Sequence, residues 1–338
     1  MVSEQISLKH AVGQLFIAGF EGTKLPIPLI GALTKGEIGG VILFSRNFES
    51  RDQIKALTDQ IHAIHSPYPI WIGIDQEGGK VQRIREDLGS DRIPAAMDIA
   101  QTTPENARSI AEHTARDLKS LGFDINFAPV LDIHTNPDNP IIATRAFGTT
   151  PDQVIRYAIP TMEGLMSGGV IPCGKHFPGH GDTNLDSHTD LPEVQHGIKR
   201  LEAVEFKPFE AAIAGGIPMI MSAHIVMRGL GEFFPATLCE SILTGILRNR
   251  LGFRGVIVSD DLEMDAIIDH YSIIKAVTFG IRAGVDAFLI CKSQYLWAPI
   301  CKQIVALAME DEGMQQRIME SAQRILELKR AHFEGKQA

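Results

Sequence analysis

One stretch of the sequence concentrates side chains that could do chemistry. Residues 175–192 read KHFPGHGDTNLDSHTDLP, where histidines and aspartates alternate with the Gly and Pro residues that favour a loop. Such a loop could bind a metal ion, could transfer a proton, or could simply contact solvent without any chemistry. Its candidate side chains are His176, His180, His188, Asp182, Asp186 and Asp190.

The spacing of one pair in this stretch favours proton transfer. Asp186 precedes His188 by two residues, so in an extended or turning loop the carboxylate can accept a hydrogen bond from the imidazole. A carboxylate in that position fixes the imidazole tautomer and raises its pKa, which makes a general acid near neutral pH. A solvated pair in a surface loop is the ordinary alternative for an isolated Asp-x-His.

A second candidate lies far downstream, in GVIVSDDLEM at residues 255–264. Asp260 follows a run of apolar residues there, with one serine between. A carboxylate at the end of a buried strand could attack an anomeric carbon and form a covalent glycosyl intermediate, as in retaining glycosidases. Asp261 and Glu263 compete for this role. Asp261 should point away from Asp260 on a strand, and it would then cap a helix or brace the loop.

These candidates need a scaffold, and the sequence predicts a parallel sheet. Apolar runs typical of strands that are covered on both faces alternate with helical patterns. The alternation indicates βαβ units, and about eight units favour a TIM (β/α)8 barrel in one domain over 1–338. A doubly wound sheet competes, but no GxGxxG turn follows a predicted strand. The predicted strands are Val12–Phe20, Gly39–Phe44, Ile70–Asp75, Phe123–Ile133, Ile171–Phe177, Met219–Ile225, Gly255–Asp260 and Ala287–Cys291. The predicted helices are Asp52–His65, Thr103–Leu121, Thr150–Gly168, Lys199–Ala214, Glu240–Arg250, Ile273–Ala283, Trp297–Met309 and Met314–Arg330.

Polar residues follow most of the predicted strands. Any single aspartate after a strand is commonly a helix N-cap. Because the carboxyl ends of parallel barrel strands meet at one rim, the recurrence instead favours an active site there. The strand exits are FSRN (44–47), IDQEGG (74–79), PVLDIHTNPDNP (129–140), the stretch from 175, MSAH (221–224) and VSDDLEMD (258–265).

The composition excludes several classes of partner. The formal net charge is −9, from 32 Lys and Arg against 41 Asp and Glu, and no basic patch appears. That balance argues against nucleic acid and, more weakly, against anionic membranes. We find no secretory signal and no apolar run of about 20 residues, so we expect no transmembrane helix. Four scattered cysteines without a CxxC pair indicate reduced, mostly buried thiols in a cytoplasmic protein.

At these residues the chain resembles the bacterial β-N-acetylhexosaminidases of glycoside hydrolase family 3, of the peptidoglycan-recycling type. The segments GGVILFSRN, IDQEGGKVQR, KHFPGHGDTNLDSHTDLP and ILRNRLGFRGVIVSDDLEM carry the resemblance, supported by INFAPVLDI and MSAHI. It runs from about Val12 to Arg330, and the long KHFPGHGDT…DSH motif is highly specific. The resemblance implies a retaining exo-β-N-acetylglucosaminidase on a TIM barrel. Its substrate would be a small carbohydrate, an N-acetylglucosaminyl muropeptide or a chitooligosaccharide, and it would need no cofactor or metal.

The resemblance also implies roles for individual residues. Asp260 would be the nucleophile, and Asp186 with His188 would be the acid/base pair. Two departures affect the loop contacts: Glu263 stands where many relatives carry a small residue, and IIATRAFG (141–148) has Ala-Thr before its arginine where Gly-Asp is expected. The implied substrate-binding residues are Asp75, Arg145, Lys175 and His176.

Several alternatives stay open at this point. A metal-dependent hydrolase on the same barrel would use the aspartates of this stretch and His176, His180 and His188 as ligands, although the HxH typical of barrel amidohydrolases is missing from the first strand. A family 3 β-glucosidase or β-xylosidase, a phosphorylase that passes the sugar to phosphate, and a non-catalytic sugar-binding barrel are further readings. We expect a monomer or weak oligomer. The length leaves no room for the second α/β sandwich domain of many family members.

Overall fold

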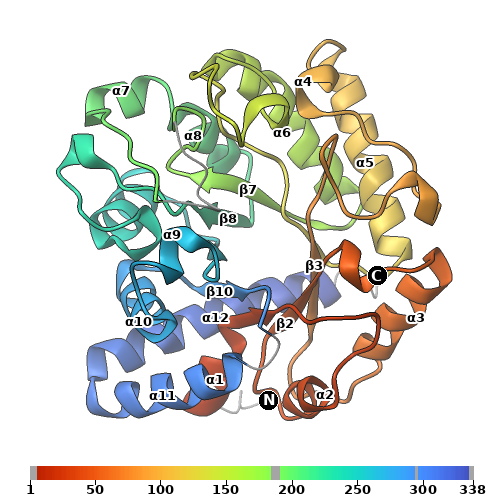
Figure 1. Ribbon diagram of the computed structural model, residues 1–338, viewed down its shortest axis with the longest axis vertical. Helices are drawn as coiled ribbons and strands as arrows, with labels where there is room; N and C mark the ends of the chain where they lie inside the picture. The colour runs from red at the N-terminus through yellow and green to blue at the C-terminus, as the bar shows by residue number, and fades with distance from the viewer. Residues whose placement is uncertain (1–5, 184–190, 294–295, 335–338) are drawn as a thin grey trace.

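Eight parallel strands form a closed barrel in the computed structural model, which describes residues 6–183, 191–293 and 296–334. The strand order around the barrel is β1-β10-β9-β8-β7-β6-β3-β2, and the helices surround it (Figure 1). This arrangement confirms the predicted TIM (β/α)8 barrel. The barrel strands are β1 (Phe16–Ala18), β2 (Gly40–Leu43), β3 (Trp71–Ile74), β6 (Ile125–Asn126), β7 (Ile171–Phe177), β8 (Met219–Ser222), β9 (Val256–Asp261) and β10 (Ala287–Ile290). A separate antiparallel hairpin consists of β4 (Gln76–Gly78) and β5 (Val81–Gln82).

The helices confirm most of the predicted segments. Thr103 and Thr150 each cap a helix by accepting a backbone N–H three residues on, and a proline follows each cap at the first helical position. The resulting helices, α5 and α6, lie side by side on the outside of the barrel (Figure 1). The α-helices are α1 (Leu8–Gln14), α2 (Ile27–Thr34), α3 (Arg51–His62), α4 (Ala96–Ile99), α5 (Pro104–Ser120), α6 (Pro151–Ser167), α7 (Ile198–Ala203), α8 (Lys207–Ala214), α9 (Asp265–Ile268), α10 (Ile273–Ala283), α11 (Trp297–Glu310) and α12 (Glu312–Glu334). The described ranges also contain a π-helix, η6 (Ser241–Arg250), and the 3-10 turns η1 (Ser45–Asn47), η2 (Glu86–Leu88), η3 (Ala143–Arg145), η4 (Arg228–Leu230) and η5 (Ala236–Leu238).

Burial explains why the barrel strands read as continuous apolar runs. Both faces of each strand are covered, one by the barrel interior and one by the helices. All seven residues of β7 are buried, including the polar pair Lys175 and His176 near its end. The Lys175–His176 peptide is cis. β7 therefore carries the first half of the histidine-rich stretch to the carboxyl end of the barrel.

Three predicted elements need correction. The run Val12–Phe20 begins as helix α1, because Ser7 caps that helix and its buried face covers the barrel, so that only β1 is strand. The run Phe123–Ile133 contributes only the short β6, and its remainder is the exit loop, which touches β7 by a single bridge at Val130. The helix Lys199–Ala214 is broken into α7 and α8. At that break Phe206 turns into the core and stacks on Phe177 at 5.7 Å between ring centroids.

The first strand and the last helix meet at the amino-terminal end of the barrel. β1 pairs with β10 in register Phe16↔Phe288, which closes the ring. Lys329 of α12 is fully buried, and its Nζ donates to Gln14 Oε1 at 2.7 Å and to the Gly39 carbonyl at 2.6 Å. Burial lowers the pKa of Lys329 to about 7. This ammonium therefore ties the last helix to the start of the chain.

Two further expectations from the sequence concern the cysteines and membrane-spanning helices. All four cysteines are free thiols, and three of them are buried, as predicted. Across the three described ranges, no helix is long and apolar enough to cross a membrane.

Candidate active site

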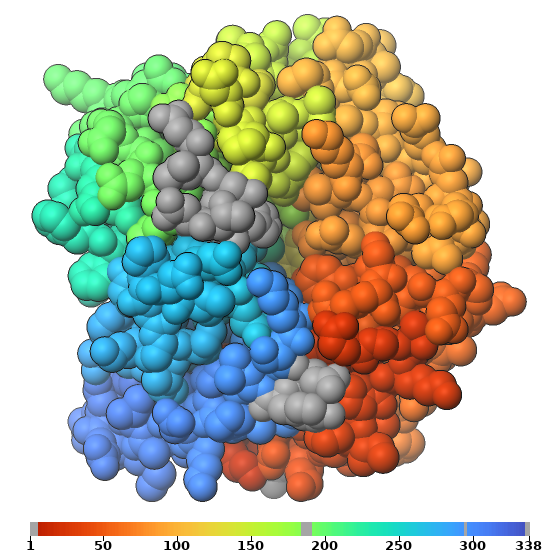
Figure 2. Space-filling model, in the orientation of Figure 1, coloured from red at the N-terminus to blue at the C-terminus, as the bar shows by residue number. Residues whose placement is uncertain are grey.

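A cavity of about 280 Å³ lies at the carboxyl ends of the barrel strands. Segments far apart in the sequence meet around the middle of the face in Figure 2, where orange, green and blue regions come together. Five of the seven predicted site residues border this cavity: Asp75, Arg145, Lys175, His176 and Asp260. The other two, Asp186 and His188, lie outside the described residues. Further residues that border the cavity include Phe44, Arg46, Glu77, Arg83, His180, Asp261 and Lys292.

A buried network of alternating charges forms one wall of the cavity. Lys175 Nζ donates to Asp75 Oδ1 at 2.9 Å and contacts Glu77 Oε1 at 2.6 Å. Arg145 donates to both carboxylate oxygens of Glu77, at 2.8 and 2.9 Å. Burial alone would raise the pKa of Glu77, but the charges of Arg145 and Lys175 outweigh it and hold that pKa well below its usual range. Glu77, Arg145 and Lys175 are therefore charged, and each side chain of the network contacts a partner before any ligand arrives.

His176 is held beside this network by a buried carboxylate. Its Nδ1 lies 2.6 Å from Asp132 Oδ2, and its Nε2 lies 3.4 Å from the Arg145 guanidinium. Asp132 also accepts the backbone N–H groups of His176 and His180. Because the carboxylate accepts the Nδ1 proton, the ring is oriented with Nε2 toward the Arg145 guanidinium. Asp132 was missed from the sequence, since its partner is 44 residues away.

Asp260 borders the cavity from the end of β9. Its Oδ1 accepts the backbone N–H of Asp261 at 2.8 Å. The neighbouring Asp261 accepts the N–H groups of Glu263 and Cys291, and burial raises the pKa of Asp261 to about 6. Asp261 therefore braces the turn after β9, but it borders the same cavity as Asp260, so the expectation that it points away from Asp260 was wrong. Asp260 is the carboxylate in this turn that suits a nucleophile.

Glu263 was considered as a competing nucleophile, and its contacts argue for a different role. It is buried and does not border the cavity. Its carboxylate accepts the backbone N–H groups of Lys292 and Ser293, which fixes the loop after β10. A side chain with these acceptors already occupied stabilises a loop and is not free to attack a sugar.

Arg145 reaches the cavity from the 3-10 turn η3. The residue two positions before it, Ala143, has φ of +40°, in the left-handed region that favours glycine. The sequence had flagged this position, because glycine is expected where this chain has Ala143. The backbone thus keeps the conformation that glycine would allow, and the departure does not remove Arg145 from the cavity.

Two further cavity residues were missed although they lie in a quoted motif. In IDQEGGKVQR only Asp75 was assigned, yet Glu77 and Arg83 also border the cavity. The Arg83 guanidinium donates to Asp75 Oδ2 at 3.3 Å and lies 5.4 Å from the Phe44 ring centroid. The hairpin of β4 and β5 turns alternate residues of the motif toward this cavity, so a period of two along the motif was the available signal.

The metal hypothesis depended on three histidines of one loop. Within the parts of the chain that the structure describes, no three His, Cys, Asp or Glu side chains form a cluster suited to a metal ion. His180 contacts Thr183 Oγ1 through its Nδ1 at 2.8 Å, and burial lowers its pKa to about 4. His188 lies outside the described residues.

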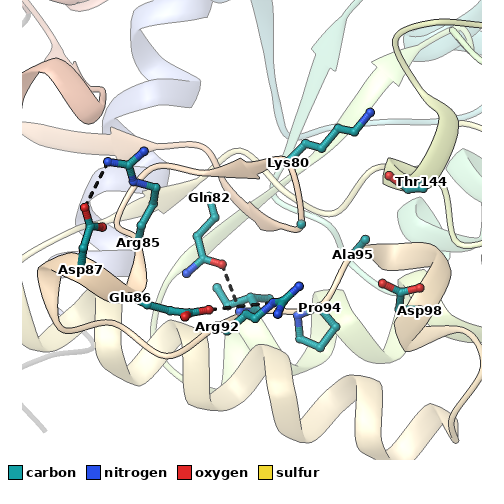
Figure 3. Close-up of a pocket in the computed structure, with 12 residues that line it drawn as sticks. Lys80, Gln82, Arg85, Glu86, Asp87, Arg92, Pro94, Ala95, Asp98 and Thr144 are labelled. Carbon is teal, nitrogen blue, oxygen red and sulfur yellow. Dashed lines mark hydrogen bonds and ion pairs between the residues drawn. The ribbon is translucent and has the colours of Figure 1, made fainter.

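A second and larger cavity lies on the outer side of the hairpin, with a volume of about 970 Å³ (Figure 3). Gln82 faces it and accepts the backbone N–H of Ile93 at 3.0 Å. Charged groups on its rim pair with one another, as Arg85 does with Asp87 at 3.2 Å (Figure 3). The larger cavity holds none of the predicted site residues that the structure describes, so the smaller one is the candidate active site.

Comparisons with known proteins place the chain in a family. A model of the glycosyl hydrolase family 3 N-terminal domain matches residues 8–328. A β-hexosaminidase of Alkalilimnicola ehrlichii is 38% identical over 280 residues, which cover 81% of this chain and 79% of that protein. β-Hexosaminidase A of Pseudoalteromonas piscicida is 37% identical over 287 residues, which cover 79% of this chain but only 48% of that protein.

Solved structures give the same result for the fold. A glycoside hydrolase family 3 β-N-acetylglucosaminidase from Paenibacillus sp. FPU-7 aligns with a TM-score of 0.91 and 36% identity, over 97% of this chain and 63% of that one. A β-N-acetylhexosaminidase from Beutenbergia cavernae aligns with a TM-score of 0.89 and 28% identity, over 96% of this chain and 98% of that one. The chain thus spans nearly all of some relatives and about half to two thirds of others.

Proposed function

Because the chain belongs to glycosyl hydrolase family 3, we propose that it is a retaining exo-β-N-acetylglucosaminidase. It would remove terminal, non-reducing, β-linked N-acetylglucosamine. The observation that carries this proposal is the meeting of Asp260 with the buried charge network of Asp75, Glu77, Arg145 and Lys175 in one cavity. A carboxylate beside an ordered set of donors and acceptors suits attack on a sugar that is held by its hydroxyl groups.

The charge network would bind the sugar without rearranging. Two of the three N–H groups of Lys175 point at the carboxylates of Asp75 and Glu77, so the third can donate to a sugar hydroxyl group. Asp75 retains acceptor capacity beyond its contacts with Lys175 and Arg83. Since these groups are aimed before the substrate arrives, little reorganisation opposes binding in the transition state.

The reaction would take place in two steps at the anomeric carbon. In the first step Asp260 attacks that carbon while His188 gives a proton to the leaving oxygen, and Asp186 stabilises the imidazolium beforehand. In the second step water attacks the glycosyl–Asp260 ester while His188 accepts a proton from it. Two inversions give net retention. The sequence motif supports the roles of Asp186 and His188, which lie outside the described residues.

Finer features of the proposal rest on the resemblance in sequence. We propose that the natural substrates are N-acetylglucosaminyl muropeptide fragments or chitooligosaccharides, processed in the cytoplasm during peptidoglycan turnover. Residues 1–338 would form one catalytic domain that acts as a monomer or weak oligomer without a cofactor.

Phosphorolysis is the second candidate, and the cations around the cavity favour it. Arg46, Arg83 and Lys292 border the cavity in addition to Arg145 and Lys175. A neutral imidazole base would also not repel phosphate as a carboxylate base would. The two reactions differ in product, so turnover with and without phosphate, read as N-acetylglucosamine against its 1-phosphate, separates them.

The test of the proposed function combines substrate choice with one substitution. We expect cleavage of p-nitrophenyl N-acetyl-β-glucosaminide in preference to the β-glucoside and β-xyloside. Asp260→Ala should lower kcat by at least about a thousandfold, because it removes the nucleophile. Its unfolding temperature should stay close to that of the native protein.

Asp59→Ala is the matched control, since Asp59 is exposed on α3 and should leave kcat unchanged. NMR of the first product should show the β-anomer. An α-anomer, or an Asp260→Ala variant with a tenth or more of native activity, would sink the proposal.

A further inference from the structure

We propose that Asp182 and His196 form a clasp that positions the acid/base segment between them, an inference that rests on the proposed function. Asp182 Oδ2 lies 2.6 Å from His196 Nε2, and Asp182 Oδ1 accepts the Thr135 hydroxyl at 2.8 Å. Asp186 and His188 lie between the two clasp residues in the sequence. The clasp therefore joins the chain before the proposed proton donor to the chain after it.

The end of the chain before that segment is fixed to the loop after β6. The backbone N–H of His180 donates to Asp132 Oδ1 at 2.6 Å, and Asn139 Nδ2 donates to the His180 carbonyl at 2.8 Å. Gly181 packs so closely that an added Cβ would lie 1.6 Å from the Ile133 carbonyl oxygen. The backbone just before Asp182 is therefore held in one position.

The end after that segment is fixed to a different loop, the one after β8. Val194 and Val226 pair through backbone bonds: the Val194 N–H donates to the Val226 carbonyl, and the Val226 N–H donates to the Pro192 carbonyl, both at 2.9 Å. Glu193 forms an ion pair with Arg228 at 2.7 Å. The two ends therefore belong to two separate parts of the barrel rim.

The hydrogen bonds of the clasp fix the orientation of both side chains. A carboxylate that already accepts the Thr135 hydroxyl has a fixed orientation, and His196 Nε2 donates its proton to the remaining oxygen. The Asp182 and His196 side chains are each 28% exposed, so solvent screens their interaction only in part. Neither residue borders the cavity. They are positioning residues, and they would act through His188.

Small displacements of an acid/base group are costly in rate. A misplacement of about 1 Å can lower a rate by roughly a hundredfold. Loss of the clasp should therefore slow the step that needs a proton from His188. A glycoside whose leaving group needs no proton should hardly be affected.

The experiment compares His196→Ala with His196→Gln on two substrates. Methyl N-acetyl-β-glucosaminide has a poor leaving group, and the 2,4-dinitrophenyl glycoside has a good one. We expect His196→Ala to lower kcat/KM at least tenfold for the methyl glycoside and less than threefold for the dinitrophenyl glycoside. His196→Gln should recover most of the loss, because its amide can still donate to Asp182. The control is His113→Ala, which breaks an exposed imidazole–carboxylate pair with Asp91 at 2.8 Å and should change neither value.

A double-mutant cycle shows whether the clasp acts through His188. In a His188→Ala background, His196→Ala should cause no further loss on the methyl glycoside. Equal losses on both substrates, or additive losses in the cycle, would mean that the pair only stabilises the fold and would overturn the inference. If the native protein cleaves neither glycoside, the proposed function itself fails, which is a separate outcome.

Discussion

Glu77 is the residue on which two cations of the cavity depend. It pairs with Arg145 through both carboxylate oxygens and also contacts Lys175, while its own side chain is 7% exposed. Without this carboxylate, Lys175 would retain its ion pair with Asp75, and Arg145 would retain only the more distant charges of Asp132 and Asp75 among the described groups that act on it. Binding and stability should therefore both depend on Glu77.

We expect Glu77→Gln to destabilise the protein by about 3–5 kcal/mol, since it leaves buried charge uncompensated. KM should rise about tenfold because Arg145 and Lys175 lose their orientation. Chemical denaturation and Michaelis kinetics measure the two effects. The control is Glu163→Gln, which breaks an exposed pair with Arg108 and should cost below about 1 kcal/mol. If both variants lost the same free energy of unfolding, the two cavity cations would not depend on Glu77.

At the residue scale, the sequence motifs predicted the side chains that border the cavity. They did not reveal the residues that hold those side chains in place. Asp75, Lys175 and Asp260 each follow or end a strand, so the barrel rule predicted their meeting. Asp132 lies in a predicted strand exit, but its role could not be assigned in this way, because that role is a contact between the loop after β6 and His176 of β7. Asp-x-His spacing at 186–188 stays a prediction, since that segment lies outside the described residues.

At the scale of elements, the loops of the rim depend on a few backbone positions. Ala143 precedes Arg145 in η3 with φ of +40°, which costs an L-residue roughly 1 kcal/mol. This cost falls on a turn that presents Arg145 to the cavity. The turn therefore keeps an unfavourable backbone conformation at Ala143 while it holds Arg145 at the cavity.

Ala143→Gly should stabilise the protein by about 0.5–1 kcal/mol, because glycine adopts positive φ without a Cβ clash. Thermal unfolding measures this change. Ala211→Gly in α8 is the control of opposite sign, since glycine inside a helix should cost about 0.5–1 kcal/mol. A destabilised Ala143→Gly variant would contradict the argument.

Gly181 should tolerate no side chain, unlike glycines with free space around them. Gly181→Ala would place its Cβ 1.6 Å from the Ile133 carbonyl oxygen, so the chain before the acid/base segment must move. We expect a loss of about 1–3 kcal/mol in stability and at least a tenfold loss in kcat/KM for poor leaving groups. Gly31→Ala in α2 meets no atom within 4 Å and should be neutral or stabilising. Thermal unfolding and kinetics distinguish the two.

Helices that begin with a clear capping motif were predicted correctly. Elements whose bounds depend on tertiary contacts were not. The Thr-Pro starts of α5 and α6 are local, so the sequence alone located them. The break between α7 and α8 depends on Phe206 stacking on Phe177, a contact that no local pattern reveals. For the same reason α1 was read as part of the first strand, because its buried face is as apolar as a strand.

At the scale of the whole molecule, Lys329 makes stability depend on pH. Its pKa is lowered to about 7 in the folded protein, while an exposed lysine has a pKa near 10.4. Between these values the unfolded chain binds more protons than the folded one, so stability should rise with pH. Asp124 opposes this shift, because its charge favours the ammonium form.

We expect the free energy of unfolding of the native protein to rise by about 2–3 kcal/mol between pH 7 and pH 9 on account of this group. Lys329→Met should remove this rise, and Lys302→Met, at an exposed position of α11, should keep it. Urea unfolding at the two pH values measures the slope. A Lys329→Met variant with the native slope would show that another group is responsible.

The pairing of β1 with β10 has a consequence for biosynthesis. Phe16 and Phe288 are neighbours in the finished ring, yet the ribosome adds roughly 5–20 residues per second, so the two strands emerge on the order of tens of seconds apart. During that interval the nascent chain carries a strand whose backbone groups along one edge have no partner. We expect chaperones that shield such edges to engage the growing chain until β10 leaves the exit tunnel and closes the seam.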